Sequence, residues 1–364
     1  PNVAGCVIWD ADNGGFYYTQ YSNEWRPKKM FYHKLGTSYH DDILLYEEKD
    51  PIATIGIGRS FDRRYLMLQA GTKDENSIHI LDLMSKNPRL TELMPRKKNR
   101  IIHAEHDKGK FYLLMNDTGP NFRLVAKDSL MGQVEELLPH NAQVYLTGIT
   151  PYEKGMILTT VEKGLNQIGF FDLNKNQYHY ISMPGDTYDL SLAPTTYEDA
   201  EVRFSYSALN KPNTVYARSF ENDTLKVLKV QEIPSGFDES LYTCTRIWAE
   251  ARDGTKVPIS LAYRHDLVKL GQANPVMLYG YGSYGYGIDS GFRQSAVSMM
   301  NRGFIYAIAH IRGGDDLGYQ WYLDGKMHNK KNTFNDFIDA AECLIKQKYT
   351  KAGMISAMGG SAGG

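Results

Sequence analysis

The chain has 364 residues, of which 42% are hydrophobic and 23% charged, and its formal net charge is −1. This composition is ordinary for a globular protein, and the length is sufficient for two domains. The balanced charge argues against a nucleic-acid or membrane-surface partner, and no apolar run approaches the roughly 18 residues of a transmembrane helix. Cys6, Cys244 and Cys343 lie far apart, so we predict neither a metal site nor a disulfide framework, and we expect a cytoplasmic location.

Residues 1–230 predict a repeated β-structure. Two sets of short apolar runs recur roughly every 44–48 residues, with polar or glycine-containing turns between them, which is the period of a four-stranded propeller blade. The first set is Phe16–Thr19, Tyr65–Leu68, Phe111–Leu114, Met156–Thr159 and Val202–Ser205. The second set is Met30–Tyr32, Ile78–Leu81, Phe122–Val125, Ile168–Phe171 and Val215–Ala217. We predict about five blades, with an irregular β-sandwich as the alternative.

The start of the chain and the number of blades together suggest a partial propeller. A closed ring requires one or two further blades, and the first residue is Pro1 rather than Met. We therefore expect a fragment whose unclosed propeller exposes a strand edge. Residues 231–243 read as a linker containing Pro234 and Gly236, so the predicted boundaries are 1–233 for the partial propeller and 234–364 for a second domain.

The second domain alternates strands and helices. A hairpin with an Asp-Gly turn comes first, and a probable helix at 292–301 ends before Gly303. The predicted strands are Cys244–Glu250, Val257–Tyr263, Val276–Tyr279, Phe304–Ala309 and Met354–Met358, the last of them buried. A helix at about 333–348 has an apolar face and a Thr333/Asp336 capping box. This order predicts a parallel α/β sheet with right-handed crossovers.

The last six residues follow the final predicted strand and contain Gly359-Gly360-Ser361-Ala362-Gly363. This is the Gly-x-Ser-x-Gly pattern of a nucleophile elbow, where a strained strand-to-helix turn presents a serine hydroxyl beside backbone N–H groups. Alone the pentapeptide is weak, because a glycine-rich loop after a strand would look the same. Its position after alternating strands and helices is that of an α/β-hydrolase elbow.

Several further motifs accompany the elbow and together resemble one family. These are Leu278–Gly285, Arg302–Phe304, Arg312–Gly314, Gly318–Tyr322, Lys330–Phe337 and Gly359–Gly364. They are similar to the prolyl oligopeptidase family of serine peptidases, and most similar to its oligopeptidase B branch, densely over 275–364 and more loosely over the propeller. The resemblance implies a propeller that covers an α/β-hydrolase active site and admits short peptides, with no cofactor.

Carried over by position, the resemblance makes Ser361 the nucleophile and Ala362 N–H and the Tyr281 hydroxyl the oxyanion hole. The family's triad histidine and aspartate come well after the elbow, so we expect neither within 364 residues. His310, at a strand end, is interpreted as a structural hydrogen bonder. Tyr281 could instead be a packed loop aromatic. Tyr284 is assigned to the wall of the substrate pocket.

Asp289 matches the first of two carboxylates with which that branch binds basic substrates, whereas Gly291 stands where the second would be. We therefore expect a weaker preference for a second basic residue, and the alternative for Asp289 is a solvated loop residue or a helix cap. Arg312 is interpreted as a structural or interdomain ion-pair residue. The adjacent Asp315-Asp316 pair is a weak ligand set without nearby His or Cys, and we predict no metal there.

The sequence thus predicts a serine-type oligopeptidase that hydrolyses short peptides after Arg or Lys, whose 364 residues alone have no turnover. One alternative is a prolyl-type oligopeptidase or another α/β-hydrolase such as an esterase. Another, from a different class, is an inert hydrolase half on a propeller binding scaffold. Cleavage preference and the sequence of the complete gene would discriminate among these.

Overall fold

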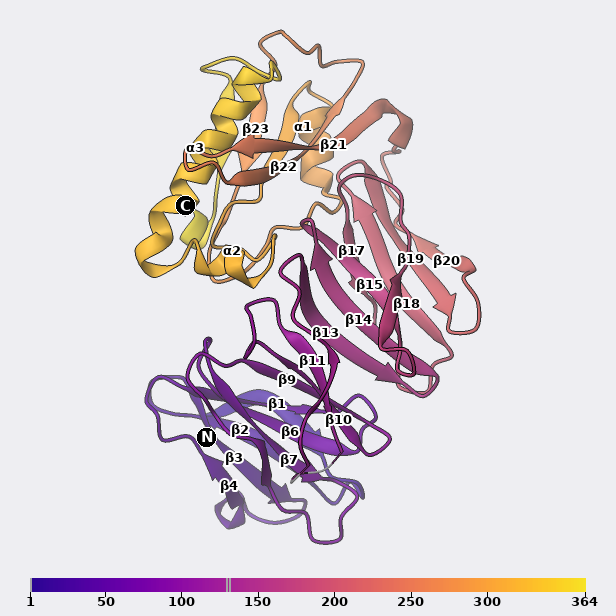
Figure 1. Cartoon of the computed structure of the whole chain (residues 1–364), viewed down its shortest axis with the longest axis vertical. Helices are drawn as coiled ribbons and strands as arrows, with labels where there is room; N and C mark the ends of the chain where they lie inside the picture. The colour runs from indigo at the N-terminus through magenta and orange to yellow at the C-terminus, as the bar shows by residue number, and fades with distance from the viewer. Residues whose placement is uncertain (1, 129, 131) are drawn as a thin grey trace.

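The computed structural model describes residues 2–128, 130 and 132–364, so Pro1 of the predicted propeller range lies outside it. Five four-stranded antiparallel sheets, followed by one five-stranded mixed sheet with helices, make up this described part of the chain (Figure 1). The predicted repeat is confirmed, because each run of the first set lies in the second strand of a sheet. Each run of the second set lies in, or overlaps, the third strand. The β-sandwich alternative is therefore wrong.

The strands of the five sheets, which are the propeller blades, follow one another in sequence order. The first two blades are β1 (Val3–Trp9), β2 (Gly15–Tyr21), β3 (Pro27–Lys34), β4 (Ile43–Glu47), β5 (Thr54–Arg59), β6 (Tyr65–Gly71), β7 (Asn76–Asp82) and β8 (Thr91–Met94). The third blade is β9 (Ile102–Asp107), β10 (Lys110–Met115), β11 (Arg123–Lys127) and β12 (Glu135–Leu138). The last two are β13 (Val144–Tyr152), β14 (Gly155–Glu162), β15 (Leu165–Asp172), β16 (Gln177–Tyr180), β17 (Asp189–Leu192), β18 (Glu201–Ala208), β19 (Lys211–Ser219) and β20 (Leu225–Val230).

Apolar side chains between neighbouring blades hold the propeller together. Alternate residues such as Leu66 and Leu68 in β6 are fully buried, as period-2 alternation requires when a strand packs against a neighbouring sheet. Each blade packs on the next one in the chain. Figure 1 shows the first blade, in indigo, and the fifth, in pink, at opposite ends of this array. The outer strand of the fifth blade, β20, is exposed along its length, and Val227 and Val230 are half exposed.

The second part of the chain forms a sheet in the order β21-β22-β24-β23-β25, in which β23 runs parallel to β24 and β25. Its strands are β21 (Tyr242–Glu250), β22 (Lys256–Arg264), β23 (Val276–Tyr279), β24 (Ile305–Ala309) and β25 (Ile355–Met358). Its α-helices are α1 (Gln294–Met300), α2 (Tyr319–Leu323) and α3 (Lys330–Lys346), and four short 3-10 turns lie at Tyr39–Asp41, Glu239–Leu241, Met327–Asn329 and Ser361–Gly363. The predicted parallel core is confirmed, with the hairpin β21–β22 attached antiparallel through β24.

Two details of the second part differ from the sequence prediction. Helix α3 begins at Lys330, three residues early, so Thr333 and Asp336 lie buried inside it and form no capping box. Their side chains instead hydrogen-bond to Arg312, a partner that the local sequence does not show. Strand β25 is also not buried, because it is the edge of the sheet and its last three residues are exposed.

The two parts touch at several points besides the linker. Arg246 of β21 donates to the carbonyl oxygens of Lys163 and Gly164 in the fourth blade, at 2.9 and 2.7 Å. The backbone N–H of Tyr319 donates to Asn121 from the third blade at 3.1 Å. None of the described helices is long and apolar enough to cross a membrane.

Candidate active site

The turn after β25 has the strained geometry expected of an elbow. Ser361 has φ +53°, which is the left-handed region that side-chain-bearing residues rarely adopt. A Cβ on Gly359 would lie 1.9 Å from the carbonyl oxygen of Gly363, so the turn requires glycine there. Ser361 is exposed, and its hydroxyl has no hydrogen-bond partner among the residues that the structure describes. The turn therefore presents a free hydroxyl at the carboxyl end of the parallel strands.

A cavity of about 470 Å³ lies beside this turn and brings together two of the predicted site residues. Tyr281 and Ala362 both line it, with the apolar side chains of Phe334 and Ile338 from α3 and Met358 from β25. Tyr281 packs directly on the elbow, since a Cβ on Gly363 would lie 3.0 Å from its Cα. Phe334 and Ile338 belong to the apolar face that the sequence predicts for this helix, and they are 54% and 47% exposed.

The loop that carries Tyr281 is fixed by polar contacts from α3. The ammonium of Lys330 donates to the carbonyl oxygen of Gly282 and to the hydroxyl of Ser283, both at 2.6 Å. Gly282 has φ +62°, and a Cβ there would lie 2.5 Å from the side chain of Thr333. This packing holds Tyr281 against the elbow. The motif 330–337 thus has a physical role that sequence reasoning did not assign.

A second serine has the connectivity of a catalytic triad, and sequence reasoning did not find it. The Ser260 hydroxyl lies 2.8 Å from His310 Nε2, and His310 Nδ1 lies 2.8 Å from the Asp316 carboxylate. However, Ser260 is completely buried, and the hydroxyls of Thr187 and Ser290 occupy its remaining sides at 2.6 and 2.9 Å. A substrate carbonyl has no approach to this hydroxyl. The cluster is a buried hydrogen-bond network, in which His310 is the structural hydrogen bonder that the sequence predicts.

Asp289 lies at the interface between the two parts and is half exposed. It pairs with Arg293 at 3.1 Å and accepts a hydrogen bond from the N–H of Gly291, so it caps no helix. A Cβ on Gly291 would lie 2.8 Å from the hydroxyl of Ser207 and 3.5 Å from Cβ of Asp189, both in the fifth blade. Burial, and then the charge of Asp289, raise the pKa of Asp189. A propeller carboxylate therefore stands next to the position where Gly291 has none.

Tyr284 is placed away from the cavity beside the elbow. Its ring is 57% exposed and faces the second blade, where Lys73 lies 5.3 Å from the ring centroid. The structure thus separates Tyr284 from Tyr281, Ala362 and Ser361. The assignment of Tyr284 to a substrate pocket stays a prediction.

Comparison with known proteins decides the family of this chain. The family model described as prolyl oligopeptidase, N-terminal β-propeller domain, matches residues 1–231. The prolyl oligopeptidase family model matches residues 290–364. The chain belongs to the prolyl oligopeptidase family.

Two curated family members illustrate the likeness. The chain is 33% identical to dipeptidyl aminopeptidase BI of Pseudoxanthomonas mexicana over all of its own length and 51% of that protein. It is 31% identical to protease 2 of Moraxella lacunata, again over its whole length and 53% of that protein. The chain therefore spans about half the length of these family members.

Solved structures of family members extend the likeness to the fold. Oligopeptidase B from Leishmania major superposes with a TM-score of 0.92 at 30% identity, over 99% of this chain and 52% of that one. Oligopeptidase B from Trypanosoma brucei, in a closed form with covalently bound antipain, gives a TM-score of 0.92 at 32% identity, over 99% of this chain and 53% of that one. Together with the sheet order, these matches establish a propeller followed by the start of the family's hydrolase domain.

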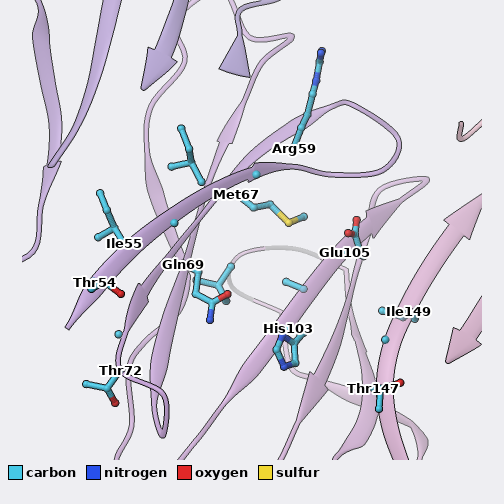
Figure 2. A pocket seen from close by; sticks show the side chains of 17 residues that line it. Thr54, Ile55, Arg59, Met67, Gln69, Thr72, His103, Glu105, Thr147 and Ile149 are labelled. Carbon is cyan, nitrogen blue, oxygen red and sulfur yellow. The ribbon is translucent and has the colours of Figure 1, made fainter. Parts of the chain in front are cut away.

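Between its inner strands, the propeller of this family member has a cavity of about 650 Å³, which we call the propeller channel. Figure 2 shows its lining residues, contributed by β5, β6, β7, β9 and β13 and the turn after β6, among them Thr54, Gln69, Thr72, His103, Glu105 and Thr147. Glu105 accepts a hydrogen bond from the N–H of Phe61 at 3.0 Å. Desolvation raises the pKa of Glu105 to about 7, because it disfavours the charged carboxylate.

Two charged groups of the family's hydrolase domain lie away from the elbow. Arg312 is buried and pairs with Asp336 and Asp253, both at 2.6 Å, which agrees with a structural ion pair within one domain. The Arg312 hydrogen bond lowers the pKa of Asp253 to about 2. The Asp315 carboxyl accepts the N–H of Gly287 at 2.9 Å. Across residues 2–128, 130 and 132–364, no group of three His, Cys, Asp or Glu side chains is arranged to hold a metal ion.

Proposed function

We propose that this chain is part of a serine-type oligopeptidase that cleaves short peptides after basic residues through an acyl-enzyme at Ser361. The observation that carries the proposal is the free hydroxyl of Ser361 on a positive-φ turn, beside the cavity that Tyr281 and Ala362 line. Membership of the prolyl oligopeptidase family supports a peptidase. The exposure of Ser361 argues for it over Ser260, which is enclosed by other hydroxyls.

The chemistry follows from the elbow. Ser361 Oγ forms a bond to the scissile carbonyl carbon while a base takes its proton, and the carbonyl oxygen becomes an oxyanion. The Ala362 N–H and the Tyr281 hydroxyl are the proposed donors to that oxyanion, and such a donor is worth roughly 10²–10³ in kcat. The C–N bond then breaks, the amine leaves with a proton, and water hydrolyses the ester at Ser361. No histidine in the described part of the chain is hydrogen-bonded to Ser361, so the base has to come from elsewhere.

A preference for basic residues is supported by the carboxylates at the domain interface. Asp289 is half exposed and shares a cavity of about 360 Å³ with Asp315 and Asp316, while Asp189 adjoins it across the two domains. We infer that Asp189 compensates in part for the carboxylate that Gly291 lacks. A cationic side chain of a peptide would compete with Arg293 for the half-exposed carboxylate of Asp289 there.

The substrate proposal is tested with peptide amides that differ at one position. A protein that carries this chain and shows turnover is given Arg, Lys, Pro and Ala substrates, each with a free and with a blocked N-terminus. We expect Arg and Lys to exceed Pro by at least about tenfold in kcat/KM, because a basic side chain gains a charge partner. Asp289→Asn should reduce that ratio. Faster cleavage after Pro would contradict the proposal, and cleavage restricted to free N-termini would point to a dipeptidyl peptidase.

The 364-residue chain alone provides a separate prediction. We expect this chain not to hydrolyse an Arg-amide peptide, because no histidine in the described part of the chain is hydrogen-bonded to the Ser361 hydroxyl to act as its base. Hydrolysis by this chain that Ser361→Ala abolishes would contradict that expectation.

A further inference from the structure

The β6–β7 turn of the second blade carries a lysine that reaches the loop of Tyr281 from the other domain. The ammonium of Lys73 donates a hydrogen bond to the carbonyl oxygen of Tyr284. It also lies 5.3, 4.9 and 5.4 Å from the ring centroids of Tyr284, Tyr286 and Tyr322. These distances are those of cation–π contacts, so one cation is held by three rings.

The neighbouring residue of the same turn makes a second contact with the hydrolase domain. Asp74 pairs with Lys326 at 2.7 Å, and the ammonium of Lys326 lies 4.8 Å from the centroid of the Tyr322 ring. The two side chains of this turn thus bind one patch, formed by the Tyr284 loop, Tyr322 of α2 and the segment after α2. We call this contact the Lys73 clasp.

The loop held by the clasp is the one that carries Tyr281, and its backbone is strained. Tyr284 has φ +58°, between Gly282 and Gly285 with φ +62° and +63°. A residue with a side chain persists in that region when surrounding contacts over-determine it. Lys330 fixes the carbonyl of Gly282 from within the hydrolase domain, and Lys73 fixes the carbonyl of Tyr284 from the propeller.

The clasp differs from the other contacts between the domains in where it lies. The buried Thr187–Ser260 contact belongs to the fifth blade, which the linker joins directly to β21. Lys73 belongs to the second blade and is solvent-exposed. Of these two contacts, the clasp is therefore the one that is open to solvent and that lies farther from the linker along the chain.

We propose that Lys73 is a positioning residue that couples contact with the propeller to the order of the Tyr281 loop. With the clasp formed, the Tyr284 carbonyl is fixed and Tyr281 stays beside the elbow. With the clasp released, the strained loop loses one of its two cationic anchors. The catalytic meaning of this coupling rests on the proposed function, whereas the coupling itself is a property of the chain.

Hydrogen exchange of the 364-residue chain tests the coupling without any turnover. The reporters are the N–H of Gly285, which donates to Gly313, and the N–H of Tyr286, which donates to Ser283. Lys73→Met should raise their exchange rates about three- to tenfold, because local opening becomes easier. Lys73→Arg keeps a cation and should stay within about twofold of the wild type. Lys154→Met, which removes an exposed pair with Glu221, is the matched control and should change nothing there.

Two results would contradict the proposed coupling between Lys73 and the Tyr281 loop. One is unchanged exchange at Gly285 and Tyr286 in Lys73→Met. The other is an equal increase in β22, the buried strand of the same domain, since that would report loss of global stability.

A second arm uses a protein that carries this chain and shows turnover. Lys73→Met should then lower kcat about three- to tenfold with little change in KM, because the oxyanion donor acts in the transition state. Lys73→Arg should restore kcat. Full turnover in Ser361→Ala would contradict the proposed function and leave the exchange result standing, whereas a change confined to KM would overturn the positioning role.

Discussion

Arg312 makes the most consequential buried ion pair of the hydrolase domain. Its guanidinium forms two hydrogen bonds with Asp336, whose side chain is fully buried, and a third with the partly exposed Asp253. Removal of one partner of such a pair leaves the other charge buried without compensation. The net stabilisation by the intact pair is therefore smaller than the destabilisation that follows when Asp336 loses its partner.

We expect Arg312→Met to lower the free energy of unfolding by about 3–5 kcal/mol, because Asp336 would keep a buried charge. Urea denaturation of the chain measures the change. Asp253→Asn is the control, and it should cost less than about 1 kcal/mol because that partner is 42% exposed. Equal losses in the two variants would contradict this account of the pair.

For single residues, the sequence predicted the structure well where a motif determines the local backbone geometry. The positive φ of Ser361 follows from Gly-x-Ser-x-Gly, and the structural role of Arg312 was anticipated. Ser260 was not, because its partners Thr187 and His310 are 73 and 50 residues away in the chain. The position of Asp189 beside Asp289 was missed for the same reason.

The elbow, as an element, depends on one glycine and tolerates change at its neighbour. A Cβ on Gly359 would collide with the backbone of Gly363, whereas a Cβ on Gly360 would meet nothing within 4 Å. The two adjacent positions thus form a matched pair for substitution.

We predict that Gly359→Ala lowers kcat/KM at least about 100-fold in a protein that turns over, since the turn must shift and misplace the nucleophile. Gly360→Ala should stay within about threefold, because its backbone is extended and its surroundings are open. Peptide hydrolysis measures both. Similar losses at the two positions would show that the collision is not the cause.

The elements themselves were well predicted where hydrophobic periodicity is strong. The second and third strands of all five blades were found, because they are the apolar strands of each repeat. The start of α3 was placed three residues late, since Thr333 and Asp336 mimic a cap while binding Arg312. The exposure of β25 could not be inferred from its apolar sequence, because burial depends on what packs against an edge.

On the scale of the whole molecule, the propeller channel carries a titrating group. Well below pH 4.5, Glu105 is protonated in both the folded and the unfolded state and does not change the free energy of unfolding. As pH rises towards 7, the unfolded state ionises freely, whereas the folded state retains its proton. The free energy of unfolding therefore decreases through this group as pH rises from about 4.5 to about 7.

Glu105→Gln should consequently become stabilising as pH increases. We expect no difference in free energy of unfolding at about pH 4 and a gain of roughly 1–3 kcal/mol over wild type at about pH 8. Urea midpoints of both proteins across this range provide the measurement. A difference that is constant with pH would show that Glu105 has an ordinary pKa in the channel.

The arrangement of the two domains was accessible from the sequence only as a family resemblance. Periodicity indicates blades and an α/β sheet, but it does not say which blades touch the hydrolase domain. Contacts such as Lys73 with Tyr284 join residues 211 positions apart, and neither residue has a local signature. The contacts between the two domains could therefore be identified only from the structure.

The most direct test of the central claim is to identify which serine a fluorophosphonate reagent modifies in a protein that carries this chain and cleaves peptides. Peptide mass spectrometry locates the adduct. The account predicts stoichiometric modification of Ser361, loss of peptidase activity in parallel, and no modification of the enclosed Ser260. Modification of Ser260, or full peptidase activity in Ser361→Ala, would contradict it.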